Sequence, residues 1–265
     1  MSAPIAVTIA GSDSGGGAGI QADLKTFSAF GVYGASVIAV LTAQNTKGVF
    51  AIHEVPADFI AAQMDAVFSD LDVGAVKIGM LGGTAAIDAV AAGLERHRVR
   101  NVVLDPVMAA SSGETLLRAD AIGALRKLAT QASVLTPNLP EAAVLLDTAA
   151  ACDEDEMRRQ AKTLLALGPG AVLIKGGHGS GPESIDLLVD ADACTRFAAQ
   201  RIETRNTHGT GCTLASAIAA GLAKGLSLGD AVREAKAYVS AAIAAADRLN
   251  VGSGRGPVHH FHKWW

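Results

Sequence analysis

The segment Asn206–Thr213 reads Asn-Thr-His-Gly-Thr-Gly-Cys-Thr and leads into an alanine-rich, helix-like stretch. Gly209 and Gly211 let the backbone turn tightly and approach a ligand closely. The free N–H groups at a helix start, together with the helix dipole, favour an anion, and a phosphoryl group in transfer develops negative charge that such groups stabilise. Gly209, Thr210 and Gly211 are therefore candidate catalytic residues, although the local sequence fits an ordinary helix-capping loop equally well.

Cys212 lies in the first turn of the same predicted helix, where the pKa of a thiol can be lowered. Its thiol would then lie beside the reacting hydroxyl and act as its base; alternatively it is a small buried apolar side chain. Lys175 closes an apolar run and precedes Gly176 and Gly177. Its ammonium group can reach a phosphate while the glycines let a nucleotide approach. The alternative is a lysine that marks the exposed end of a strand.

Two carboxylates are candidate magnesium ligands. Asp105 directly follows an apolar run, and Glu141 lies three residues after Asn138. Magnesium commonly uses one or two carboxylates together with substrate phosphates. Asn138 and Glu141 also have the spacing of a capping box, which explains them without any ligand.

The glycine-rich segment 11–19 excludes several enzyme classes. It contains neither the Lys-Ser/Thr pair of a P-loop nor the G-x-G-x-x-G pattern of a dinucleotide site. A nucleophile elbow needs serine at the centre of its five residues, and Asp13 stands there instead. The C-terminal histidines His259, His260 and His262 have no acidic or cysteine neighbour in sequence, so we expect packing or interface roles rather than metal binding.

The elements that must position these side chains alternate along the chain, which predicts an α/β fold with a mostly parallel central sheet and helices on both faces. Short apolar runs predict strands, several of them buried on both faces. We expect strands at Ile5–Ala10, Ser36–Leu41, Ala75–Ile78, Asn101–Leu104, Ser133–Thr136 and Ala171–Ile174, and a local pair near Asp186–Val189 and Arg196–Ile202. We expect helices near Ala18–Phe30, Ala57–Ser69, Thr84–His97, Arg118–Thr130, Asp153–Leu167, Cys212–Gly225 and Leu228–Leu249, with another opening at Asn138.

Polar or glycine residues follow the carboxyl end of each expected strand in the predicted parallel sheet. In open parallel sheets, ligands bind at that edge. The residues concerned include Gly11, Gln44, Met80, Asp105, Asn138 and Lys175. The agreement among several strands predicts one ligand site better than any single motif does.

Composition sets the broad class of the protein. The chain has 265 residues, half of them apolar, with 18% charged residues and a net charge of −4. These values predict a large core in a single domain, residues 1–265, and argue against a nucleic-acid partner, which usually requires a basic face. The three cysteines lack C-x-x-C spacing, the first residues lack a basic leader, and no apolar run is long enough for a bilayer. We therefore expect a cytoplasmic protein without a membrane partner.

Taken together and in order, these motifs resemble the hydroxymethylpyrimidine/phosphomethylpyrimidine kinase family, a branch of the ribokinase-like kinases. The similarity extends over nearly the whole chain. The segments that carry it are 8–13, 16–26, 43–46, 77–81, 105–108, 136–142, 175–178, 206–213 and 256–262.

The resemblance implies a role for each candidate. Gly209–Cys212 would form the anion hole, with Cys212 as the catalytic base at a position where many ribokinase-like enzymes carry aspartate. Gln44 would read the pyrimidine, because its amide offers a donor beside an acceptor. Asp23 by itself reads as a solvated charge on a helix. The resemblance implies a substrate pocket of Gln44, Gly11, Asp23, Met80 and Val107, an ATP site of Thr136, Asn138, Lys175, Gly176 and Gly177, and Mg²⁺ held by Asp105 and Glu141.

The activity implied is ATP-dependent phosphorylation of 4-amino-5-hydroxymethyl-2-methylpyrimidine to its monophosphate and then its diphosphate, in thiamine diphosphate biosynthesis. The resemblance also implies a homodimer. Two alternatives remain open: a pyridoxal/pyridoxine kinase of the same fold, and a non-catalytic pyrimidine-binding sensor. The presence of Lys175, Glu141 and the Gly209–Cys212 segment argues against the sensor, because binding alone needs no phosphoryl site.

Overall fold

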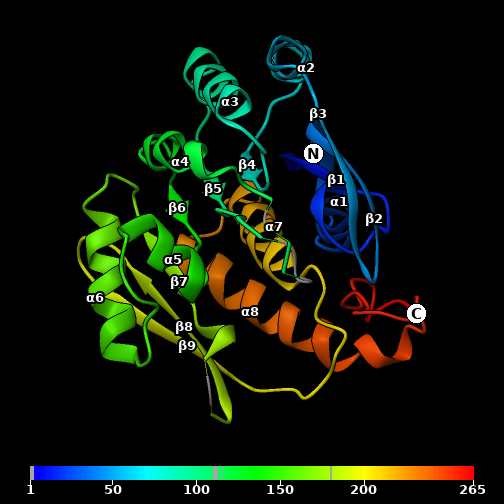
Figure 1. Cartoon of the computed structure of the whole chain (residues 1–265), viewed down its shortest axis with the longest axis vertical. Helices are drawn as coiled ribbons and strands as arrows, with labels where there is room; N and C mark the ends of the chain where they lie inside the picture. Colours follow the sequence, from blue (N-terminus) through cyan, green and yellow to red (C-terminus); the bar gives the residue numbers. More distant parts are fainter. Residues whose placement is uncertain (1–2, 110–112, 115, 180) are drawn as a thin grey trace.

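A computed structural model describes residues 3–109, 113–114, 116–179 and 181–265. In this part of the chain, nine strands form one sheet in the order β3-β2-β1-β4-β5-β6-β7-β8-β9 (Figure 1). The six central strands are parallel, and β3, β8 and β9 are antiparallel to their neighbours. The strands are β1 Ile5–Asp13, β2 Tyr33–Asn45, β3 Gly48–Glu54, β4 Ala75–Ile78, β5 Val102–Leu104, β6 Val134–Leu135, β7 Val172–Lys175, β8 Glu183–Val189 and β9 Cys194–Gln200.

Helices cover both faces of this sheet, which confirms the predicted α/β class. One apolar core lies between the sheet and the helices α2 to α6, and a second lies between the sheet and α1, α7 and α8. The helices are α1 Gly19–Ala29, α2 Ala57–Phe68, α3 Thr84–Arg96, α4 Ile122–Ala129, α5 Leu139–Leu146, α6 Glu154–Leu165, α7 Thr210–Ala223 and α8 Leu228–Ala244. Short 3₁₀ turns occupy Ala119–Ala121, Gly176–His178 and Ala246–Arg248.

The small side chains of α7 allow it to lie close to its neighbours. Nearly the whole of the segment Thr213–Gly221 is buried. A Cβ added at Gly221 would lie 2.8 Å from the Cβ of Ala231 in α8, so the two helices can approach this closely only with glycine there. This packing fixes the start of α7 at the carboxyl edge of the central strands, where the anion site was predicted.

The strand β3 was not predicted from the sequence. It pairs antiparallel with the far half of β2, and the two form a ribbon that carries Thr42 and Gln44. Most of β3 is exposed on both faces, so its sequence lacks the alternation that marks a half-buried strand. Among the described residues, none of the helices combines the length and apolarity needed to cross a membrane.

Candidate active site

A cavity of about 960 Å³ opens at the carboxyl edge of the parallel strands. Most of the residues that the sequence singled out line it, although they come from distant parts of the chain. Those that line it are Gly11, Gln44, Met80, Asp105, Val107, Asn138, Glu141, Lys175, Gly177, Gly209, Thr210, Gly211 and Cys212. Asp23, Thr136 and Gly176 do not belong to the lining and stand behind it.

The start of α7 forms one end of the cavity. Gly209 has a left-handed backbone with φ 80°, and a Cβ there would lie 1.9 Å from the carbonyl oxygen of Gly17. A Cβ at Gly211 would lie 3.4 Å from Nζ of Lys175 and 3.6 Å from Oδ2 of Asp105. The first amide groups of a helix have no acceptor within it. The anion-binding helix start and the Lys175 ammonium therefore lie at the same place, which we call the phosphate end.

Lys175 lies between two carboxylates at the phosphate end. Its Nζ is 2.5 Å from Oδ1 of Asp105 and 4.0 Å from Oε2 of Glu141. Burial lowers the pKa of the Lys175 ammonium, but the two carboxylates outweigh burial and raise the pKa overall. Lys175 therefore stays charged, and two carboxylates share one cation.

Glu141 also completes the capping box that its spacing predicted. The side chain of Asn138 accepts from the Glu141 N–H at 2.9 Å, and Oε2 of Glu141 accepts from the Asn138 N–H at 2.8 Å. Burial raises the pKa of Glu141 to about 7; Lys175 opposes the rise and Asp105 adds to it. The capping explanation is thus correct, and it leaves a carboxylate facing the cavity with little to neutralise it.

The donor set fits magnesium. Asp105 and Glu141 supply only oxygen atoms, which Mg²⁺ prefers, and their shared ammonium leaves surplus negative charge beside the cavity. Oε2 of Glu141 is also engaged by the helix cap.

The pKa of the Cys212 thiol differs from the expectation. A lowered pKa was expected at the helix start, whereas burial raises the pKa of the thiol to about 11. The nearby Lys77 lowers the pKa, but Asp23 and Asp105 raise it further. The local helix dipole is weaker than the desolvation of a thiolate in this site, so the resting thiol is protonated at neutral pH.

Asp23 is a buried support and not a solvated charge. Its side chain is 0% exposed and accepts from the hydroxyls of Thr8 and Ser216, each at 2.6 Å. Nζ of Lys77 lies 2.8 Å from its Oδ2. Asp23 lies on the buried face of α1, where β1, β4 and α7 supply its three partners. Sequence reasoning missed Lys77, which lines the cavity; the signal was a lysine inside the otherwise apolar run 75–78.

Thr136 and Gly176 also act from behind the wall. The Thr136 hydroxyl is fully buried and lies 3.2 Å from Oδ1 of Asp105. The N–H of Gly176 donates to Asp186, and a Cβ there would lie 2.1 Å from the carbonyl oxygen of Ile185. These residues hold Asp105 and the end of β7 in place, whereas Asn138, Lys175 and Gly177 line the cavity itself.

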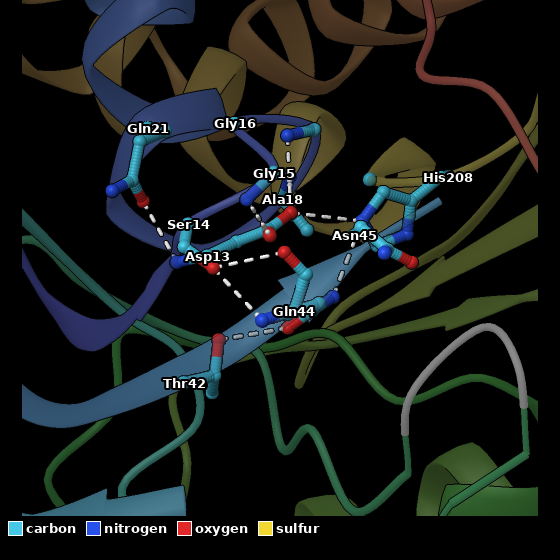
Figure 2. Close-up of polar contacts among 12 residues, drawn as sticks. Asp13, Ser14, Gly15, Gly16, Ala18, Gln21, Thr42, Gln44, Asn45 and His208 are labelled. Atoms are coloured by element: carbon cyan, nitrogen blue, oxygen red, sulfur yellow. Dashed lines mark hydrogen bonds and ion pairs between the residues drawn. The ribbon is translucent and has the colours of Figure 1, made fainter. Parts of the chain in front are cut away.

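A neighbouring part of the cavity, here called the acceptor end, is organised around Asp13 (Figure 2). Its carboxylate accepts from the backbone N–H groups of Gly15, Gly17 and Ala18 at 2.8 to 3.0 Å. Nε2 of His208 lies 2.9 Å from Oδ2 of Asp13. Burial raises the pKa of Asp13, but these hydrogen bonds, with that from His208 the strongest, hold the pKa below its usual value. Asp13 therefore joins the loop after β1 to the segment before α7.

Gln44 lies at the same end, on β2. Its side-chain nitrogen is 3.4 Å from Nε2 of His208, and its side-chain oxygen is 3.0 Å from the Thr42 hydroxyl. Gly11 and Met80 are in contact nearby, since a Cβ at Gly11 would lie 3.2 Å from the Met80 methyl. An amide, a flat apolar wall and a glycine together suit a planar heteroaromatic ring.

Comparison with known proteins agrees with this geometry. The phosphomethylpyrimidine kinase family model matches residues 13–259. A hydroxymethylpyrimidine/phosphomethylpyrimidine kinase of Rhizobium meliloti is 63% identical over 262 residues, 98% of each chain. A thiamine biosynthesis bifunctional protein of Geobacter sulfurreducens is 52% identical over 96% of this chain and 51% of its own. The crystal structure of an ADP complex of Bacillus subtilis pyridoxal kinase has a TM-score of 0.91 and 36% identity, with 99% of each chain covered.

The sheet, with an anion-binding helix start and a lysine at its carboxyl edge, defines a small-molecule kinase of the ribokinase-like fold. Within that class, the chain belongs to the phosphomethylpyrimidine kinase family.

Proposed function

We propose that this protein transfers the γ-phosphate of ATP to 4-amino-5-hydroxymethyl-2-methylpyrimidine, and then phosphorylates the monophosphate to the diphosphate used in thiamine diphosphate biosynthesis. One observation carries the proposal: the start of α7, Lys175 and Asp105 meet in the same cavity that the Gln44 amide lines. This supports a phosphoryl donor and a nitrogen heterocycle bound in one cavity. Family membership supports both assignments.

At the acceptor end, the Gln44 amide would pair with the amino group and adjacent ring nitrogen of the pyrimidine. Gly11, Met80 and Val107 would contact the ring, with Met80 as an adaptable apolar wall. Asp23 would support this floor through Lys77 instead of touching the substrate.

At the phosphate end, the amides of Gly209–Cys212 and the Lys175 ammonium would hold the transferring phosphoryl group. Positioning and charge stabilisation dominate such reactions. The substrate hydroxymethyl oxygen attacks the γ-phosphorus in line while the bond from the γ-phosphorus to the bridging β-phosphate oxygen breaks and ADP leaves. Cys212, in its thiolate form, accepts the hydroxyl proton. When bound, Mg²⁺ at Asp105 and Glu141 would neutralise phosphate charge. In the second round, a phosphate oxygen of the monophosphate takes the place of the hydroxymethyl oxygen.

The nucleotide would lie along Asn138, Lys175 and Gly177, with Thr136 and Gly176 fixing that wall from behind. We further propose a single kinase domain over residues 1–265 that acts as a cytoplasmic homodimer. The exposed Trp264 and Trp265 and the outer face of the β2–β3 ribbon, with Phe50 and Ile52, offer apolar surface for a second copy.

A coupled assay of ADP release with Mg-ATP tests the function. We expect turnover with both the hydroxymethylpyrimidine and its monophosphate. Turnover with pyridoxal alone would replace the assignment with pyridoxal kinase, the activity named for the similar Bacillus subtilis protein. Binding of the pyrimidine without ADP release from any acceptor would leave the sensor. Measuring both pyrimidines on a Lys175→Met variant would show whether one phosphate end serves both steps.

A further inference from the structure

Four side chains form a continuous polar chain along the acceptor end: Thr42, Gln44, His208 and Asp13 (Figure 2). Asp13 and His208 are separated by 195 residues in sequence. All four line the part of the cavity in which the substrate ring would lie. The orientation of the Gln44 amide is therefore set by its neighbours.

Asp13 determines which ring nitrogen of His208 carries a hydrogen. Asp13 already accepts three backbone N–H groups, which stabilise its ionised form. An ionised carboxylate only accepts hydrogen bonds. Nε2 of His208, at 2.9 Å from Oδ2 of Asp13, must therefore carry a hydrogen.

The Gln44 amide can lie in two orientations that differ by a half-turn. With its nitrogen towards His208 and its oxygen towards Thr42, the Gln44 amide would set two donors against each other. The single hydroxyl hydrogen of Thr42 would also have to serve two acceptors, the Gln44 oxygen at 3.0 Å and the Ser12 carbonyl at 2.9 Å. A half-turn of the amide removes the opposed donors and leaves the Thr42 hydrogen to Ser12 alone. One amide N–H then donates to Thr42. The amide oxygen shares the Nε2–H of His208, which donates mainly to Asp13 at 2.9 Å and more weakly to this oxygen at 3.4 Å. Amide nitrogen and oxygen have nearly the same shape, so hydrogen bonding decides between them.

We propose that His208, held by Asp13, is a positioning residue that orients the Gln44 amide with its oxygen towards the imidazole. The orientation of the amide then determines which way round the substrate ring binds. One N–H and one lone pair of the amide remain for the ligand. A reversed amide would present donor and acceptor in the opposite order, which matches the ring only when the ring is turned over. The hydroxymethyl group would then point away from the start of α7. This inference rests on the proposed pyrimidine kinase activity and deepens it.

Gly17 gives an independent way to disturb the same chain. A Cβ added there would lie 2.5 Å from Cδ2 of His208, so alanine must push the imidazole aside without removing any polar group. Gly229 in α8 provides a matched control, since an added Cβ there meets nothing within 4 Å. His208→Gln provides a second comparison, because the glutamine amide can supply an N–H near the place of Nε2.

The experiment compares kcat/KM for 4-amino-5-hydroxymethyl-2-methylpyrimidine with kcat/KM for its analogue lacking the 4-amino group. We expect His208→Leu to reduce this discrimination about tenfold, in keeping with the loss of an oriented hydrogen-bonding pair, while KM for ATP changes by less than about twofold. His208→Gln should recover most of the discrimination. Gly17→Ala should lower it, and Gly229→Ala should not. Thermal unfolding of each variant checks that it is folded.

Unchanged discrimination in folded His208→Leu, or in Gly17→Ala, would overturn the inference while leaving the kinase assignment intact. An equal loss in His208→Leu and His208→Gln would also overturn it, because the role would not depend on an N–H donor. If the wild-type protein released no ADP with the pyrimidine, the proposed function would fail first and the inference with it.

Discussion

The two ends of the cavity neutralise their buried charges differently. At the acceptor end, each buried carboxylate has a basic partner of its own: Asp13 has His208, and Asp23 has Lys77. At the phosphate end, Asp105 and Glu141 share Lys175. The difference appears in titration, since the pKa of Asp13 is lowered whereas that of Glu141 is raised.

This contrast indicates that the protein's own side chains balance the buried charges at the acceptor end but not at the phosphate end. At the acceptor end each carboxylate has its own basic partner. The phosphate end has two carboxylates for one ammonium, a charge that the proposed Mg²⁺ would neutralise. Two cavity-lining lysines, Lys77 and Lys175, allow the comparison to be tested by matched substitutions.

The largest expected effect is on Lys175. Lys175→Met removes the only cation that Asp105 and Glu141 share among the described contacts. It also removes the ammonium proposed to hold the transferring phosphate. We expect kcat/KM for ATP to fall by about a thousandfold, the scale of losing one charged contact to a reacting group. The exposed Lys162 provides the control as Lys162→Met. A loss smaller than about tenfold would contradict the assignment of the phosphate end.

Lys77 should instead affect stability. Lys77→Met leaves Asp23 as a buried charge without its ammonium partner, which should cost about 3–5 kcal/mol of unfolding free energy. Urea unfolding measures this cost. The double variant Lys77→Met with Asp23→Leu should recover much of it, because removing both charges removes the uncompensated one. A single variant as stable as wild type would show that the acceptor end does not depend on this pair.

The pH dependence of kcat tests whether the Cys212 thiolate is the catalytic base. Because burial raises the pKa of its thiol to about 11, only a small fraction is thiolate at neutral pH. If the thiolate accepts the proton, kcat with saturating substrates should rise about tenfold per pH unit between pH 7 and 9, as the thiolate fraction does. Cys212→Ala should lose this pH dependence. A flat profile in the wild type would exclude a thiolate base.

The smallest expected effect is at Glu141. Its folded-state pKa is raised, so the folded protein holds this proton more tightly than the unfolded chain, and wild-type stability falls as pH rises from about 4.5 to about 7. Glu141→Gln keeps the capping box but carries no charge. Relative to wild type, the variant should gain about 2–3 kcal/mol of unfolding free energy between pH 5 and pH 8. Parallel pH dependence of the two proteins would remove the evidence for surplus charge.

Much of this arrangement was predictable because it depends on strand order and local spacing. Buried parallel strands end at one edge, so residues such as Asp105 and Lys175 could be placed together from sequence. The Asn138–Glu141 capping box was likewise local. The class of fold followed from the same alternation of strands and helices.

The remaining features depend on contacts that no local pattern encodes. Asp23 reads as a solvated residue of α1 until α7 supplies Ser216, 193 residues away. The raised pKa of Cys212 arises from packing over its helix start, which the dipole argument does not include. The exposed strand β3 has no buried face to pattern its sequence. In the sequence, Asp13 only showed that segment 11–15 is not a nucleophile elbow, since serine would be needed at that position. Its contact with His208 reveals its structural role.

The contact between Gly17, in the loop after β1, and Gly209, at the start of α7, also has a consequence for synthesis of the protein. The carbonyl of Gly17 occupies the place where Gly209 would carry a Cβ, and Asp13 is held from 195 residues further along the chain. On the ribosome, β1 and its following loop emerge long before the segment that they must meet. A nascent chain that stops before residue 206 can pair its first strands but contains neither end of the site in finished form. Catalytic competence in this protein is therefore acquired late in translation, when α7 docks.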